Sequence, residues 1–455
     1  MLRLREFLFK PHVIALIAFA LRLGYFLFKV YSRPPSLGHG VLDGFETVQI
    51  ASSLATGRGF SSPIAVDSGP TAWLTPVFPC LLAGVFKVLG VGSFRAEVGI
   101  KLLDSFFSAL VCIPLVALGR RLSVPAVGVL SAWLWALLPS SIFYAVVWVW
   151  DTSLSALCLT LLLYYSYTVF ETPNWRSWAG YGALCAFAAL TNAVLLSALP
   201  GLALFATFRA RYHSTAWLRN ALIATLVFIA GIAPWIVRNE IVFKGQVAFR
   251  STFGLELWLG NNPQVADLWA PWLHPSNKPE ERQRFLLLGE PAYMKEKQRL
   301  ALEFIASNPS DTLVLTYHRF MTTWTGGDNY LNDLWSPLPL SLRLDMLLNC
   351  SFSLLSFAGL WMLCRTRAAD SAPFVWLLLT FPVAYYITHP SPRYRCPLEP
   401  SMAFLAVYAI AGANRWLAQR NASLPEEHNC TDHGCIHYEA IVNGELPADK
   451  PSLNQ

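Results

Sequence analysis

Acidic side chains in this sequence gather at the ends of long apolar segments. Asp43 and Glu46 lie in LDGFE, shortly after the first apolar segment, and Asp151 lies in WVWDTS between two others. A carboxylate within hydrogen-bond reach can accept the proton of a hydroxyl group as that group attacks a substrate. Asp43 and Glu46 are three residues apart, so they would share one face of a short helix. We therefore take Asp43, Glu46 and Asp151 as candidate catalytic residues.

Basic side chains occupy similar positions. Arg58 follows the first acidic pair, and His389, Arg393 and Arg395 lie in HPSPRYRCPLEP, ahead of the last apolar segment. Planar guanidinium groups bind phosphate oxygens with two parallel hydrogen bonds. We predict that these four residues bind the phosphate of a substrate. Acids and bases at one membrane surface suit chemistry on a lipid-borne anion.

Each candidate also has a structural alternative. Asp43 could cap the helix expected over FETVQIASSLA, and Asp151 could cap the fourth spanning helix. Arg393 and Arg395 could be interfacial anchors that snorkel to the surface, and Glu399 could pair with one of them. The residue types alone leave both interpretations open.

The composition is that of a membrane protein. Of 455 residues, 55% are hydrophobic and 14% are charged, whereas soluble domains carry about 25% charged residues. Many of the 17 Trp residues lie where apolar segments meet polar loops, as expected at bilayer interfaces. The net charge of +6 is scattered along the chain without a basic block, which argues against a nucleic-acid partner.

About ten spanning helices are predicted, each close to the roughly 20 residues that cross a bilayer. The first ends near Tyr31, and a cleaved signal peptide ending near Ala20 is its alternative. The prolines in 73–90 indicate an interfacial or re-entrant element. The other nine segments lie at about 98–118, 124–147, 152–170, 178–195, 196–208, 220–237, 344–364, 372–388 and 396–413. The segment 177–208 holds two spans only if it turns near Pro200.

The positive residues of the short loops predict a cytoplasmic N-terminus. Two large non-cytoplasmic loops follow, at 32–97 and 239–343, and the second contains an amphipathic helix near 292–307. The spans look nearly free of charge. The polar segment 416–455 includes HNCTDHGCIH, whose spacing matches no standard zinc site, and we predict a disordered cytoplasmic tail. The protein is expected in the plasma (inner) membrane, with its site facing the periplasm or exterior.

Several stretches together resemble the GT-C superfamily of membrane glycosyltransferases. The resemblance is strongest to the bacterial branch related to protein mannosyltransferases and the lipid A aminoarabinose transferase, and it covers about 1–415. The stretches are LDGFETVQIASSLATGRGFSSP, GPTAWLTPVFPCLLAGVFKVLG, PWIVRNEIVFKGQVAFRSTFGLELWLGNNP, NPSDTLVLTYHRFMTTW and HPSPRYRCPLEP.

This resemblance implies an all-α GT-C-like bundle that uses a polyprenyl- or dolichyl-phosphate sugar and inverts the anomeric centre. It implies an essential first-loop acid at Asp43, with Glu46 beside it, and a second acid at Asp151. Many relatives have adjacent acids in the first loop, whereas Gly44 and Phe45 intervene here, so the identity of the base stays open. Some members bind a divalent cation through such acids, and the dependence on a metal stays open too.

The sequence therefore predicts a glycosyltransferase with a polyprenyl-phosphate-linked sugar donor and a protein, lipid or glycan acceptor. The alternative is a transporter or flippase of lipid-linked anionic glycans, in which the same basic residues bind headgroups. A transporter should have polar or broken helices at the bilayer midplane. Apart from prolines and Asn192 the spans look plain, which favours the enzyme.

Overall fold

The computed structural model describes residues 7–32, 46–64, 66–172, 174–265, 268–326 and 340–422. The chain forms two compact units, Met1–Ala411 and Gly412–Gln455. The described part of the second unit is the C-terminal end of the last helix. Asp43 and most of the polar tail lie outside the described residues, so predictions about them stay predictions.

The protein is an all-α polytopic membrane protein. Within the described residues, eight helical segments are long and apolar enough to cross a membrane. A helix pair bent by 51° at Leu138 makes a ninth if the pair is counted as one span. The expected count of about ten therefore stays a prediction. The helices of these segments are α2 (Pro11–Tyr31), α5 (Phe94–Leu110), α6 (Cys112–Arg121), α7 (Pro125–Leu137), α8 (Pro139–Val146), α9 (Thr152–Ser166), α11 (Leu199–Ala210), α12 (Trp217–Phe243), α18 (Leu340–Thr366), α19 (Ala368–Thr380), α20 (Val383–Ile387), α21 (Pro392–Arg395) and α22 (Glu399–Ala422).

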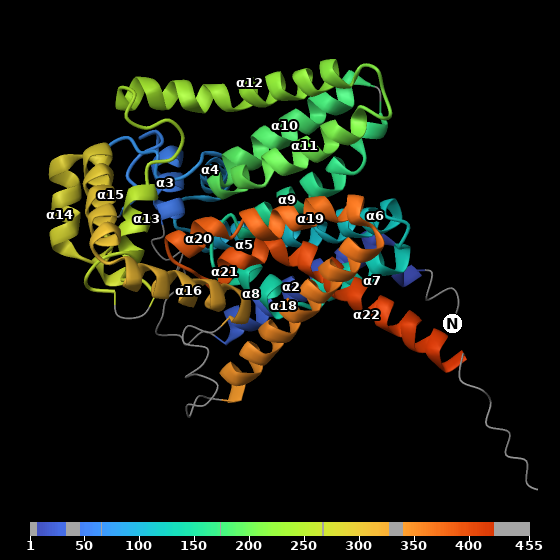
Figure 1. The fold of residues 1–455 in the computed structure, drawn as a ribbon. Helices are drawn as coiled ribbons and strands as arrows, with labels where there is room; N and C mark the ends of the chain where they lie inside the picture. Colours follow the sequence, from blue (N-terminus) through green and yellow to red (C-terminus); the bar gives the residue numbers. More distant parts are fainter. Residues whose placement is uncertain are drawn as a thin grey trace, which may run out of the picture. The chain divides into compact units, whose positions relative to one another are not determined.

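Two further groups of helices separate some of these segments along the chain (Figure 1). The first group is α3 (Glu46–Ala55) and α4 (Val77–Leu89), and the second is α13 (Phe253–Gly260), α14 (Pro279–Leu288), α15 (Glu290–Ser307) and α16 (Pro309–Thr325). The amphipathic helix expected near 292–307 is confirmed as part of α15. A shared core of Ile50, Ile64 and Trp73 against Leu255 and Phe285 joins the two groups.

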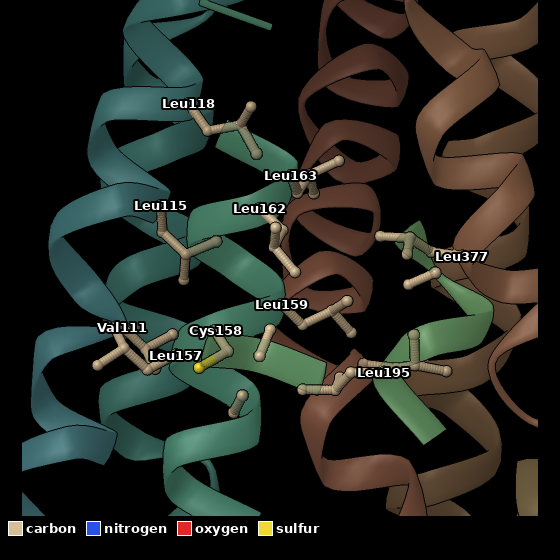
Figure 2. Close-up of a cluster of buried hydrophobic side chains, with 14 of the residues drawn as sticks. Val111, Leu115, Leu118, Leu157, Cys158, Leu159, Leu162, Leu163, Leu195 and Leu377 are labelled. Atoms are coloured by element: carbon tan, nitrogen blue, oxygen red, sulfur yellow. The ribbon is translucent and has the colours of Figure 1, made fainter. Parts of the chain in front are cut away.

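The centre of the bundle is α9, which is apolar around most of its circumference and therefore suited to a fully surrounded position. Figure 2 shows its leucines, including Leu159 and Leu162, between Leu115 of α6 and Leu377 of α19. Cys158 is buried in the same cluster. A cysteine in such apolar surroundings acts as a small hydrophobic residue.

Two expectations about the spans are wrong. The chain turns at Asn192 rather than near Pro200, because the Asn192 side chain accepts a hydrogen bond from the Val194 amide at 2.9 Å and so ends α10 (Trp175–Thr191). The spans are also not free of charge, since α5 buries Glu97, Lys101 and Asp104 almost completely. These three residues recur at helical spacing on one face, so they point into the bundle.

Close backbone packing joins α10 to α12 through Gly182. A Cβ atom added at Gly182 would lie 2.2 Å from the carbonyl oxygen of Ala224, whereas one added at Gly180 would meet nothing within 4 Å. Both glycines belong to α10, and Gly180 is exposed. Gly182 is therefore required by the contact between the two helices.

We predict that Gly182→Ala lowers the free energy of unfolding by about 1–3 kcal/mol, the usual cost of overpacking. Gly180→Ala is the matched control, and it should leave stability unchanged or raise it by up to about 1 kcal/mol through helix propensity. Thermal melts of the detergent-solubilised full chain measure both. Equal melting temperatures for the two variants would contradict the packing argument.

Candidate active site

A cavity of about 890 Å³ lies among the ends of helices and the connecting segments of the first unit. Residues from the start of α3, the segment after α8, α13, α20 and α21 line this cavity. Aromatic rings make up much of the wall, namely Trp73, Trp148, Trp150, Trp269, Tyr385 and Tyr394. A largely apolar pocket with a few convergent polar groups is typical of a ligand site.

The first predicted catalytic residue in the cavity is Glu46, the first residue of α3. Its Oε1 lies 3.4 Å from Nε2 of His274, and both side chains are mostly buried. The His274 ring lies edge-on to Trp73, with 5.6 Å between ring centroids. This contact places a first-loop carboxylate against the second loop region, where an imidazole can support its negative charge.

A second carboxylate, Glu256 of α13, faces the same cavity. Its Oε2 lies 2.8 Å from Nε2 of His389, and its Oε1 lies 3.6 Å from Arg250. Burial alone raises the pKa of the Glu256 carboxyl, but the hydrogen bond from His389 and the charges of His389 and Arg250 outweigh burial and lower the pKa to about 2. Glu256 is therefore ionised at neutral pH.

Arg393 is held in the cavity wall by aromatic rings. Its guanidinium carbon lies 3.8 Å from the centroid of Trp150 and 4.9 Å from that of Tyr394. Tyr394 in turn stacks on Tyr385 at 4.3 Å. A guanidinium over an aromatic face is stabilised there while its N–H edges stay available to an anion.

Asp151 borders a smaller cavity of about 20 Å³. Asn192 and Arg250 line both this cavity and the main one. The volume of the smaller cavity is enough for one water molecule. Asp151 stands at the N-cap position of α9, but its side chain makes no capping bond. Its Oδ2 accepts hydrogen bonds from Asn192 at 2.7 Å and Ser155 at 2.9 Å. The carboxylate thus holds the chain at Asn192, where α10 has ended and the following residues line the cavity.

Two predicted phosphate ligands lie away from the cavity lining. Arg395 is buried, pairs with Glu399 at 3.3 Å and also donates to Asn349. The expected pairing of Glu399 with an arginine is thereby confirmed. Arg58 is exposed and donates to the hydroxyl of Thr56 at 3.2 Å. Of the predicted site residues, the structure brings Glu46, His389 and Arg393 together.

Sequence reasoning missed the partners of these residues. Arg250, Glu256 and His274 all lie in the region 239–343, outside the basic motif near the last span. The signal was present for Glu256, because it is an isolated acid in the apolar run FGLELWLG. His274 carried no comparable signal, since nothing in the sequence indicates its contact with Glu46.

Arg319 of α16 positions the His389 side of the cavity, and it was also missed. The buried guanidinium donates to the carbonyl oxygens of Gly260, Leu268 at 3.2 Å and Ile387 at 3.1 Å. A Cβ at Gly260 would lie 1.8 Å from the carbonyl oxygen of Thr388. The GNNP turn is thus clamped directly against the end of α20, just before His389.

A metal site is not apparent in the part of the chain that the structure describes. Within the described ranges, no group of three or more His, Cys, Asp and Glu residues is arranged to hold a metal ion. Asp43 lies outside those ranges, so the participation of a divalent cation stays open.

Comparison with solved structures assigns the fold. No protein-family model and no curated protein matches the chain. The archaeal oligosaccharyltransferase AglB from Archaeoglobus fulgidus, in complex with an inhibitory peptide and a dolichol-phosphate, is similar with a TM-score of 0.54 and 12% identity over 90% of this chain. The Archaeoglobus fulgidus oligosaccharyltransferase in the apo form gives a TM-score of 0.53, with 12% identity over 90% of this chain. This chain has the GT-C fold.

The GT-C fold is matched over only part of the larger neighbour, since this chain spans 51% of the length of AglB. ArnT from Cupriavidus metallidurans also matches, with 12% identity over 85% of this chain and 77% of its own, but its TM-score of 0.37 is too low to carry an argument. At these identities the GT-C likeness concerns architecture, and the chemistry must be argued from the cavity.

The lowered pKa of Glu256 predicts a pH-dependent contribution to stability. Because the folded-state pKa of about 2 lies below the ordinary 4.5, the ionised carboxylate stabilises the fold fully above about pH 5, and this contribution is lost as the pH falls towards about 2. Near neutral pH, the free energy of unfolding of Glu256→Gln should be about 1–2 kcal/mol lower than that of wild type. This difference should shrink as the pH is lowered. Chemical denaturation across this pH range measures it, and a constant difference would contradict the assignment.

Proposed function

We propose that this chain is a glycosyltransferase that moves a sugar from a polyprenyl-phosphate donor to an acceptor, with inversion and with a first-loop carboxylate as base. The observation that carries the proposal is the cavity in which Glu46, His389 and Arg393 meet among aromatic rings. The GT-C fold supports it, as does the dolichol-phosphate and inhibitory peptide bound by AglB. The acceptor would be a protein, a lipid or a glycan.

The proposed reaction is a single displacement at the anomeric carbon. The acceptor oxygen forms a bond to that carbon while the bond from carbon to the phosphate oxygen breaks, and the electron pair of the broken bond goes to polyprenyl phosphate. The proton of the acceptor hydroxyl goes to the carboxylate. Attack opposite the leaving phosphate inverts the centre, and nearby carboxylates stabilise the positive charge that develops on the sugar.

The base is proposed to be Asp43 or Glu46. Asp43 is the residue that the family resemblance favours, and Glu46 is the first-loop acid whose position in the cavity is described. Asp151 is proposed as a supporting acid, since its charge is close enough to act on Arg393. A divalent cation, if one binds, would have to use Asp43 together with such acids.

Arg393 is proposed as the main ligand of the donor phosphate. Its aromatic contacts hold the guanidinium without using all five donors, and these donors match the geometry of phosphate oxygens. Arg395 would reach a phosphate only by releasing Glu399 and Asn349, and Arg58 would have to leave the surface. The proposal therefore assigns these two arginines weaker roles than Arg393.

The proposed location is the plasma (inner) membrane, with a cytoplasmic N-terminus and the cavity facing the periplasm or exterior. The apolar helices and the GT-C fold support an integral membrane protein in general. The distribution of positive residues in the short loops supports the proposed side of the membrane for the cavity.

We predict that membranes containing the wild-type chain transfer label from at least one of a panel of radiolabelled polyprenyl-phosphate sugars. Loss of a general base costs about 10²–10⁴ in rate, so either Asp43→Asn or Glu46→Gln should lower transfer by that factor. Asp151→Asn should have a smaller effect. Glu303→Gln is the control, because Glu303 is exposed on α15 and pairs only with Arg299 among the contacts described.

Transfer at the wild-type rate by both the Asp43 and the Glu46 variant would contradict the proposal that a first-loop carboxylate is the base.

The transporter alternative predicts different measurements. Purified chain in detergent encloses no compartment, so transfer there supports the enzyme. Movement of a labelled lipid-linked glycan across proteoliposomes without transfer would support the flippase.

We also predict that Arg393→Ala weakens binding of sugar-free polyprenyl phosphate by about tenfold or more, the usual effect of losing a charged hydrogen bond. Arg284→Ala is the control, because Arg284 is exposed on α14 and contacts Glu296. Native mass spectrometry of the detergent-purified chain can compare the two variants. Unchanged binding by Arg393→Ala would remove this residue from the phosphate site.

A further inference from the structure

Glu256 and His389 form a hydrogen-bonded pair in the cavity to which the proposed reaction assigns no role. The two side chains come from separate parts of the chain, α13 and the segment after α20, and both line the cavity. Their hydrogen bond is 2.8 Å long. Because an ionised carboxylate only accepts hydrogen bonds, Nε2 of His389 carries the hydrogen and points at Glu256.

The other ring nitrogen of His389, Nδ1, lacks a hydrogen-bond partner among the described residues. Nδ1 is buried, and the side chain as a whole is only 5% exposed. The ring stacks on Trp269 with 4.3 Å between centroids and an angle of 11°, which restrains its plane. A buried polar atom without a partner is costly, so a hydrogen-bonding group of a ligand that reaches Nδ1 would be stabilised there.

Glu256 also has unused hydrogen-bonding capacity. Each carboxylate oxygen has one described partner, His389 or Arg250, whereas a carboxylate offers about four lone-pair sites. The free sites suit donors such as hydroxyl groups. A phosphate does not fit here, because its negative charge would be repelled by the ionised Glu256.

The position of the pair relative to Arg393 gives its role. Tyr394 contacts both, since its ring centroid lies 5.7 Å from that of His389 and 4.9 Å from the Arg393 guanidinium carbon. A phosphate bound at Arg393 would therefore have its sugar within reach of His389 and Glu256. Aromatic rings, Trp269 and Tyr394, flank that position and can pack against a sugar ring.

We propose that Glu256 and His389 form the subsite that recognises hydroxyl groups of the donor sugar, and that this sugar is neutral. The inference rests on the proposed function, and it reassigns His389 from the phosphate to the sugar. Arg250 and His389 already balance the charge of Glu256, so a cationic amino sugar would have no uncompensated carboxylate to pair with there. A hydroxyl group can donate to the free sites of Glu256, and because it both donates and accepts hydrogen bonds it can also pair with Nδ1 of His389.

The test separates the carrier from its sugar by measuring binding of two probes to the detergent-purified full chain. One probe is sugar-free polyprenyl phosphate, and the other is a panel of polyprenyl-phosphate hexoses and pentoses, with a 4-amino-pentose derivative as the cationic member. Wild type should bind at least one neutral member about tenfold or more tightly than the sugar-free carrier, and the cationic member should gain no such increment.

Glu256→Gln and His389→Gln should lose this increment while binding the sugar-free carrier as wild type does. Glu303→Gln should keep both the binding of the sugar-free carrier and the increment from the sugar. An unchanged far-ultraviolet circular dichroism spectrum and unchanged carrier binding show that a variant is folded. The proposal is overturned if the variants keep the increment, if they lose carrier binding in proportion, or if no neutral sugar adds affinity in wild type. If wild type fails to bind the sugar-free carrier at all, the proposed function itself fails.

Discussion

The structure depends on the requirement that arginine side chains buried inside a membrane protein be surrounded by hydrogen-bond acceptors. A buried guanidinium without partners would be expensive in an apolar medium, so each buried arginine collects acceptors from several helices. Arg22 donates to Ser108 and Ser141 at 2.8 Å and to the carbonyl of Ala136. It thereby joins α2 to three later segments. Arg319 does the same beside the cavity, and Arg395 does so outside the cavity lining.

The cavity is a product of the same constraint. Arg319 clamps the GNNP turn to the end of α20, which sets the position of His389. His389 in turn meets Glu256, and Arg250 donates to the carbonyl of Trp73 at 3.0 Å, so the first loop region is tied to the second. Charge compensation across loops that are distant in sequence therefore builds a polar wall on an aromatic cavity. The proposed division into phosphate, base and sugar positions follows from this wall.

Breaks in the spanning helices have a role in this arrangement. The chain interrupts its helices at Leu138, Asn192 and Pro382, and irregular backbone at membrane depth is tolerated where it lines a cavity or is buried in protein. Asn192 and the residues after it line the cavity, as do Val383 and Ala384 after Pro382. The plain appearance of the spans in the sequence was thus a poor guide, and so was the argument against a transporter that relied on it. The enzyme proposal stands on the cavity chemistry instead.

The sequence by itself determined the class of the molecule. Long apolar runs and sparse charge require membrane helices, because only internally hydrogen-bonded segments cross a bilayer. The resemblance of several stretches to known glycosyltransferases led to the GT-C fold. Acids and bases at helix ends led to Glu46, His389 and Arg393, and such positions along the chain can be read without a structure.

Only the tertiary structure decided which of these residues meet and which new ones join them. Arg393 and Arg395 are two residues apart, yet one faces the cavity and the other is buried against Glu399. Glu46 and His274, like Glu256 and His389, are separated by more than a hundred residues. Pairing over such distances is set by the packing of whole helices, and no periodicity or motif in a single sequence records it.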